Sequence, residues 1–189
     1  AGNVGVGLST PSQKLAVNGN ISVPAANSYM YSSAKTKYLS VPASSFVLQN
    51  TFLVSGTGIS LGGYATGQAR WVQGGTTGVD ANLFAPVILP DSAVIKSLDV
   101  YAYDGSSTEE VSVELYSLQN GASNPVSIAS TNASGASFAT GLITLAATNL
   151  NQVIDNAGYS YYLRFKTKES SNQLRLYAVK VTYTVTREN

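Results

Sequence analysis

Short segments with strand character recur along most of the chain, and this recurrence constrains the fold more than any other feature. They lie at residues 70–73, 83–89, 94–103, 111–118, 126–131, 142–146, 159–168 and 174–185. Turn signals separate several of them, for example Asp104-Gly105 and Asn120-Gly121. No segment shows a convincing helical periodicity. The pattern predicts an all-β chain folded as an antiparallel β-sandwich of jelly-roll type.

The last two segments predict a register in more detail. If residues 169–172 form a hairpin turn, Leu163, Phe165, Leu174 and Leu176 share one face, which we expect to be buried. The apolar phase shifts after Ala178, which predicts a β-bulge near Tyr177. The opposite face of this hairpin carries the basic residues Arg164, Lys166 and Arg175.

The N-terminal segment, residues 1–24, contains three very short apolar alternations. They centre on Val4, Val6 and Leu8, on Leu15 and Val17, and on Ile21 and Val23. Three such strands cannot bury a core alone. A partner surface is required, and identical chains wound around a common axis would supply it, with Val4, Val6, Leu8, Leu15, Val17 and Ile21 at the interface. We therefore expect a stalk segment and connector at residues 1–30 and a sandwich head at residues 31–189.

Composition restricts the chemistry that the chain can perform. Among 189 residues there is no His, which excludes catalytic triads, imidazole bases and His-ligated metals, and there is no Cys. The net charge of +1 argues against general nucleic-acid binding. No apolar run is long enough to span a membrane. We expect no catalysis, no metal ion and no cofactor.

Two arrangements of acidic residues leave narrow alternatives open. Asp99 and Glu114 would form a glycosidase pair if they faced each other across adjacent strands, but a solvated sheet face is the simpler explanation for both. The loop 104–110 offers carboxylates for Ca²⁺ but lacks the alternation of an EF-hand loop.

Aromatic and basic residues are the candidates for binding. The chain contains twelve Tyr, and aromatic rings with phenol hydroxyls suit sugar recognition. The ligand-binding candidates are Tyr64, Arg70, Trp71, Arg164, Lys166 and Arg175. Trp71 also fits a core or interface anchor, and the basic residues also fit a solvated sheet face, with an anionic polysaccharide as their functional alternative. Tyr101, Tyr103 and Tyr116 are expected on outward strand faces, as a subunit interface.

Two stretches resemble known families. The segment GNVGVGLSTPSQKLAVNGNI at 2–21 resembles a repeat of phage tail fibres and bacterial trimeric fibre adhesins, including the mosaic adhesive trimer fibres of predatory bacteria. It departs from that repeat at Leu8 and Ala16. The segments at 36–46, 83–104, 156–168 and 172–185 are similar to a β-sandwich domain of secreted bacterial proteins. Together the resemblances imply a homotrimeric fibre end with a globular head.

The resulting hypothesis is an extracellular or cell-surface fibre-tip adhesin that binds a glycan or envelope protein of a host or prey cell. A phage virion tail is the alternative location. A purely structural fibre subunit and a glycan hydrolase are the alternative functions.

Overall fold

The structure is a computed structural model that describes residues 2–24, 27, 30–48, 53–54, 57–58, 60–63, 70–73, 81–106, 111–132, 141–167 and 173–187. Within these residues the chain is built of strands, with one 3-10 turn at Ala43–Ser45. The strands are β1 (Val4–Val6), β2 (Leu15–Val17), β3 (Met30–Pro42), β4 (Val47–Leu48), β5 (Leu53–Val54), β6 (Thr57–Gly58), β7 (Ser60–Gly63), β8 (Arg70–Gln73), β9 (Ala81–Pro86), β10 (Val94–Asp104), β11 (Ser112–Gln119), β12 (Val126–Asn132), β13 (Gly141–Ala147), β14 (Gln152–Val153), β15 (Tyr159–Thr167) and β16 (Leu174–Arg187).

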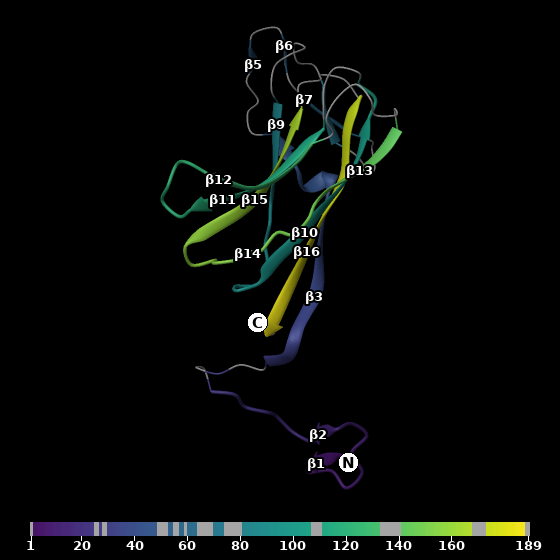
Figure 1. The fold of residues 1–189 in the computed structure, drawn as a ribbon, viewed down its shortest axis with the longest axis vertical. Coiled ribbons are helices and arrows are strands. Elements are labelled where there is room, and N and C mark those ends of the chain that lie inside the picture. Colours follow the sequence, from purple (N-terminus) through teal and green to yellow (C-terminus); the bar gives the residue numbers. More distant parts are fainter. Residues whose placement is uncertain are drawn as a thin grey trace.

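Two antiparallel sheets form the head, which confirms the predicted β-sandwich (Figure 1). The first, called the β10 sheet, has the order β13-β10-β16-β8-β7, and β14 pairs with β10 while β3 pairs with β16. The second, called the β11 sheet, has the order β12-β11-β15-β9-β4. Strand alternation places one face of each sheet on the common core and the other outside.

The core lies between the inner faces of the two sheets. Leu98, Val100 and Val181 from the β10 sheet meet Leu115 and Phe165 from the β11 sheet in one buried cluster. Burying an apolar side chain of this size contributes about 1.5–3 kcal/mol relative to leaving it exposed. Because the alternation along each strand sets which side chains point inward, the polar and aromatic residues between them are directed onto the outer faces.

The predicted hairpin between β15 and β16 is wrong, although its buried face is right. Leu163 and Leu176 are buried as expected. However, β15 pairs with β11 and β9, whereas β16 pairs with β10, β3 and β8. The two strands therefore lie in different sheets and bury their apolar faces on the same core from opposite sides, which the alternation alone cannot distinguish from a hairpin.

The predicted bulge in β16 is confirmed. Tyr101 pairs with Ala178, and the next residue, Ala102, pairs with Leu176, so Tyr177 is the extra residue. This bulge lets Leu176 and Val179, which are three positions apart, both face the core.

The N-terminal segment forms two of the three expected strands. β1 and β2 pair in parallel, with Val4 opposite Leu15. Residues 20–24 are not a strand, so the expected strand at Ile21 and Val23 is wrong. Figure 1 shows this pair apart from the two sheets. β3 begins at Met30, which pairs with Arg187 of β16, so the last residue assigned to the stalk and connector already belongs to the β10 sheet. The division of the chain at residue 30 remains a prediction.

Candidate functional site

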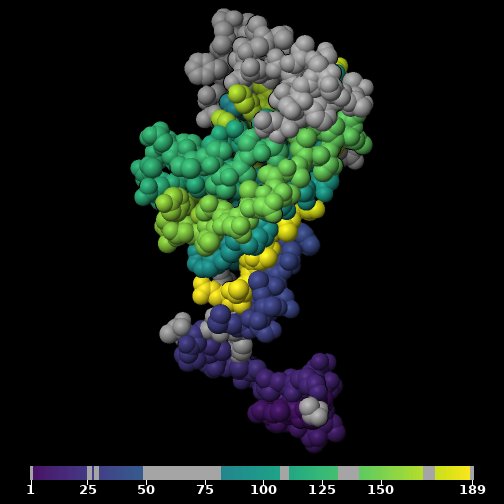
Figure 2. Space-filling model, viewed as in Figure 1, coloured from purple at the N-terminus to yellow at the C-terminus, as the bar shows by residue number. Residues whose placement is uncertain are grey.

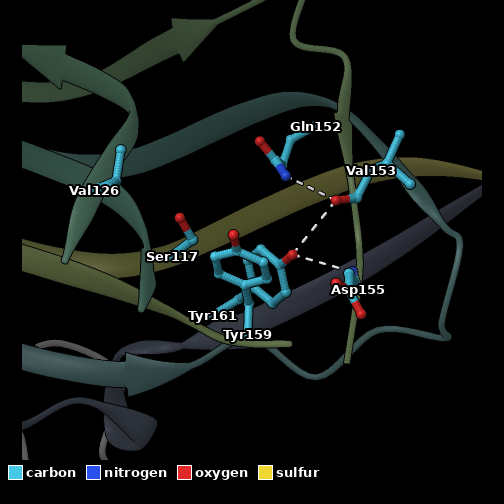
Figure 3. Close-up of a pocket in the computed structure, with 7 residues that line it drawn as sticks. All are labelled: Ser117, Val126, Gln152, Val153, Asp155, Tyr159 and Tyr161. Carbon is cyan, nitrogen blue, oxygen red and sulfur yellow. Dashed lines mark hydrogen bonds between the residues drawn. The ribbon is translucent and has the colours of Figure 1, made fainter. Parts of the chain in front are cut away.

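A pocket of about 310 Å³ opens where β14, on one side of the β10 sheet, meets β11, β12 and β15 of the β11 sheet, and we call it the edge pocket. Its described lining residues come from β11, β12, β14, β15 and the loop after β14: Ser117, Val126, Gln152, Val153, Asp155, Tyr159 and Tyr161. Figure 3 shows the rings of Tyr159 and Tyr161 between Ser117 on one side and the segment from Gln152 to Asp155 on the other. In Figure 2 the parts of the chain that carry them, teal and green, lie side by side across the middle of the molecule. The volume falls at the lower end of the range for small-ligand sites.

Tyr161 holds the wall of the edge pocket in place. Its side chain is 6% exposed, and its hydroxyl accepts a hydrogen bond from the backbone N–H of Asp155 at 3.1 Å. The same hydroxyl donates to the carbonyl oxygen of Val153 at 3.4 Å (Figure 3). Gln152 adds a second bond to that carbonyl, from Nε2 at 2.7 Å. The Tyr161 hydroxyl thus ties β14 to β15, in addition to the backbone pairing that holds β14 on β10.

Asp155 is fixed by the turn that follows it. Its Oδ1 accepts hydrogen bonds from the backbone N–H groups of Ala157 and Gly158, both at 3.1 Å. The turn is tied to the neighbouring loop because Asn120 Nδ2 donates to the carbonyl oxygen of Ala157 at 3.1 Å. The carboxylate is thus held in one orientation, so little side-chain freedom remains to be lost when a ligand binds.

Tyr159 is the aromatic residue that the edge pocket presents to solvent. Its side chain is 37% exposed, and its ring centroid lies 6.5 Å from that of Tyr161, with the ring planes at 40°. Beside these rings stand the Ser117 hydroxyl, the Gln152 amide and the Asp155 carboxylate. An aromatic face next to convergent polar groups is an arrangement that can bind a polyhydroxylated ring, with its C–H face on the aromatic ring and its hydroxyls on the polar groups.

The outer face of the β11 sheet carries a second aromatic group, which we call the aromatic stack: Phe84, Tyr116, Tyr162 and Arg164. Tyr116 and Tyr162 stack with centroids 5.5 Å apart at 13°, and the Arg164 guanidinium lies 4.8 Å from the Tyr116 centroid. Arg164 also forms an ion pair with Glu114, with Nε donating at 2.6 Å. Since Tyr116 already has a ring and a guanidinium as neighbours, less of it is left to stack on a ligand.

Burial in this stack raises the pKa of two tyrosine hydroxyls. For Tyr116 the largest cause is desolvation, followed by the negative charge of Glu114, while the positive charge of Arg164 opposes both. For Tyr162 desolvation again raises the pKa, and Arg164 partly offsets it.

The outer face of the β10 sheet has its own charged group around Lys180. Its Nζ lies 2.7 Å from Asp99 Oδ2 and donates to the Tyr101 hydroxyl at 3.4 Å. The hydrogen bond to Asp99 is the main reason that the pKa of Lys180 is raised. Nearby, the Arg175 guanidinium lies 4.5 Å from the ring centroid of Tyr103.

The structure divides the residues that the sequence grouped together. Arg164 and Lys166 lie on the outer face of the β11 sheet and Arg175 on that of the β10 sheet, so the single basic face is wrong. Likewise Tyr116 is separated from Tyr101 and Tyr103 by the thickness of the sandwich. In both cases the residues lie on strands that belong to different sheets.

The two carboxylates of the alternative glycosidase pair lie in different sheets. Asp99 lies on β10 and Glu114 on β11, and each is paired with a cation of its own sheet. Among the residues that the structure describes, no group of three or more Asp or Glu side chains is placed to hold a metal ion.

Three candidates can be placed only in part. Arg70 and Trp71 lie in β8, paired with Gly63 and Gly62, and their side chains are outside the described part of the structure. Tyr64 lies outside the described residues. Their role in binding stays a prediction.

The residues of the edge pocket were missed at the sequence level. β14 is too short to give an alternating pattern, and the lining comes from separate segments of the chain. The one available signal was Tyr159 and Tyr161, two residues apart on one strand face beside the turn residues 156–158.

No protein-family model matches the chain, and the comparison with curated proteins gave no match. Among solved structures, the C-terminal CBM6 of LamC, a marine laminarinase from Zobellia galactanivorans, matches with a TM-score of 0.46 and 14% identity, over 77% of this chain and 99% of that one. CsCBM6-3 from Clostridium stercorarium, in complex with cellobiose, matches with a TM-score of 0.39 and 8% identity, over 80% and 94%. The CBM22-1 and GH10 modules of xylanase 10B from Clostridium thermocellum match with a TM-score of 0.41 and 12% identity, over 79% and 27%.

These neighbours are carbohydrate-binding modules, one of them attached to a GH10 enzyme. TM-scores below 0.5 at such identities are too low to carry an inference to this chain. The sandwich architecture stands on the strand pairing itself. No helix in the described part of the chain is long and apolar enough to cross a membrane.

Proposed function

We propose that the chain is a non-catalytic glycan-binding adhesin of a fibre tip, located outside the cell or at its surface, and that the edge pocket binds the glycan. The observation that carries this proposal is the edge pocket itself, where the half-exposed ring of Tyr159 stands beside the fixed Asp155 carboxylate and the Gln152 amide. Each of these groups is of the kind that contacts a sugar ring or its hydroxyls.

The experiment is a glycan array with the wild-type chain and three variants. Tyr159→Ala is expected to lower the affinity for the glycan at least tenfold. Exposed aromatic rings that pack on a ligand are among the residues that dominate binding energy. Tyr38→Ala is the matched control, because Tyr38 is 65% exposed on the outer face of the β10 sheet. It should bind as the wild type does.

Arg164→Ala distinguishes the edge pocket from the face of the β11 sheet. Loss of binding in Arg164→Ala with none in Tyr159→Ala would move the site to Arg164 and Lys166. An array with no bound glycan at all would refute the glycan-binding role and favour a purely structural fibre subunit.

The fibre part of the proposal is supported by the N-terminal segment. Val4 and Leu15 are 58% and 60% exposed although they face each other in the β1–β2 pair. A two-stranded sheet of three residues per strand is not stable in water without further packing. With no charged residue except Lys14 in residues 2–24, a further copy of the same segment is a suitable partner.

Light scattering tests the trimer. The wild-type chain is expected at three times its mass of 19.7 kDa. The double variant Val4→Asp with Leu15→Asp should be monomeric, because each added carboxylate would be buried against its copies. A monomeric wild-type chain would refute the trimer and leave glycan binding in the edge pocket to be decided by the array.

A further inference from the structure

The charge of the edge pocket points to the class of glycan that it takes. Asp155 is the one charged residue among the described residues that line it, and none of these is Lys or Arg. Two cations bound to neighbouring segments have partners of their own: Arg187 lies 3.8 Å from Asp91, and Lys96 Nζ donates to Asn151 Oδ1 at 2.8 Å. The described wall of the edge pocket therefore carries a single, negative charge.

The two oxygens of Asp155 have different roles. Oδ1 accepts two hydrogen bonds from the turn, which fixes the plane of the carboxylate. Oδ2 lies so close to Gly158 that a Cβ added there would stand 2.7 Å from it. No side chain at position 158 blocks Oδ2, which has capacity to accept hydrogen bonds from the hydroxyls of a bound sugar.

The segment that carries Asp155 is fastened on both sides, so the carboxylate cannot easily turn away from a ligand. The N–H of Ile154 donates to the carbonyl oxygen of Ala93 at 2.8 Å. On the other side, Asn156 Nδ2 donates to the carbonyl oxygen of Leu89 at 3.0 Å. A fixed negative charge repels a second carboxylate within a few ångströms.

We propose that Asp155 makes the edge pocket selective for uncharged sugars and excludes acidic ones such as uronic acids. This inference rests on the proposed glycan-binding role. The basic residues Arg164, Lys166 and Arg175 would instead favour an anionic polysaccharide. Binding in the edge pocket and binding at these basic residues therefore predict different ligands. The selectivity also depends on Gly158, because a larger residue at this position would displace Asp155 Oδ2.

The probes are soluble gluco-, manno-, galacto- and xylo-oligosaccharides. Each of the three hexose series is paired with a derivative whose C6 is oxidised to a carboxylate. Affinities are measured by calorimetry at low and at high salt. The wild type should bind at least one neutral hexose probe and should bind its oxidised partner about tenfold more weakly. Added salt should narrow that gap.

Two variants and a control assign the selectivity. Asp155→Asn keeps the shape of the side chain and one acceptor oxygen for the turn, and it replaces the other oxygen by an NH2 donor without charge. The gap between neutral and oxidised probes should therefore shrink to less than threefold. Gly158→Ala keeps the charge but displaces Oδ2, so binding of the neutral probe should weaken about threefold or more. Asp99→Asn removes a carboxylate on the outer face of the β10 sheet and should leave the gap unchanged.

Each result decides the inference. Equal binding of neutral and oxidised probes by the wild type, or an unchanged gap in Asp155→Asn, overturns the selectivity while glycan binding stands. Binding of no probe, neutral or oxidised, overturns the selectivity together with the glycan-binding role.

Discussion

The hydroxyl of Tyr161 joins β15 to the segment after β14, by accepting a hydrogen bond from the backbone N–H of Asp155 at 3.1 Å. It thereby connects the β11 sheet with the edge strand of the β10 sheet. Removing this one oxygen leaves a buried ring in place and frees the wall of the edge pocket.

Tyr161→Phe is expected to lower the free energy of unfolding by about 1 kcal/mol, with an unchanged dependence on urea concentration. Binding in the edge pocket should weaken as well, because the Asp155 segment loses an anchor. Tyr159→Phe is the control, since no hydrogen bond of its hydroxyl to another described residue is found, and its stability should stay within about 0.5 kcal/mol of the wild type. Equal stability of wild type and Tyr161→Phe would contradict the anchoring role.

The bulge in β16 leads to a second expectation, which concerns deletion. Without Tyr177, Ala178 alone would separate Leu176 from Val179, so strict alternation would keep both side chains on the core. Tyr101 would still pair with Ala178 and Ala102 with Leu176, as in the wild type. Deletion of Tyr177 should therefore give a folded protein, judged by circular dichroism and a cooperative thermal transition.

Deletion of Lys180 is the contrasting variant. It would turn Val181, Tyr183 and Val185 from the core to the outer face, because a shift of one residue inverts every following side chain. No cooperative transition is expected. If both deletions behave alike, the register of β16 is not what fixes its faces.

How far the sequence predicts this molecule depends on which question is asked. The alternation of Leu163 with Phe165 and of Leu174 with Leu176 correctly predicts which side chains are buried. It does not predict which strands pair, because pairing depends on contacts between segments far apart in the chain, and both arrangements bury the same face.

The candidate site shows the same limit more sharply. The β10 sheet contributes Gln152 and Val153 to the edge pocket, and the β11 sheet contributes Ser117, Tyr159 and Tyr161. Only the packing of the two sheets against each other brings these residues into one pocket. Arg164 was a binding candidate because a basic sheet face can bind an anionic polysaccharide. In the folded chain its guanidinium is engaged by Glu114 and Tyr116, which no local pattern reveals.

The raised pKa values of Tyr116 and Tyr162 predict how stability depends on alkaline pH. A group whose pKa is higher in the folded than in the unfolded state adds stability that is fully present below the unfolded value, here about 10, and is lost as pH rises through the folded value. The contribution of these two groups to the free energy of unfolding should thus be constant up to about pH 10 and should fall above it.

The double variant Tyr116→Phe with Tyr162→Phe checks the assignment. It removes both ionisable hydroxyls and keeps the rings, so the fall above pH 10 should become shallower in urea titrations taken at successive pH values. Lys180 contributes a fall in the same direction, since its pKa is also raised, and some slope should therefore remain. Tyr38→Phe, whose ring is largely exposed, should leave the wild-type profile unchanged. A profile of the double variant that coincides with the wild type would show that the stack does not carry the alkaline transition.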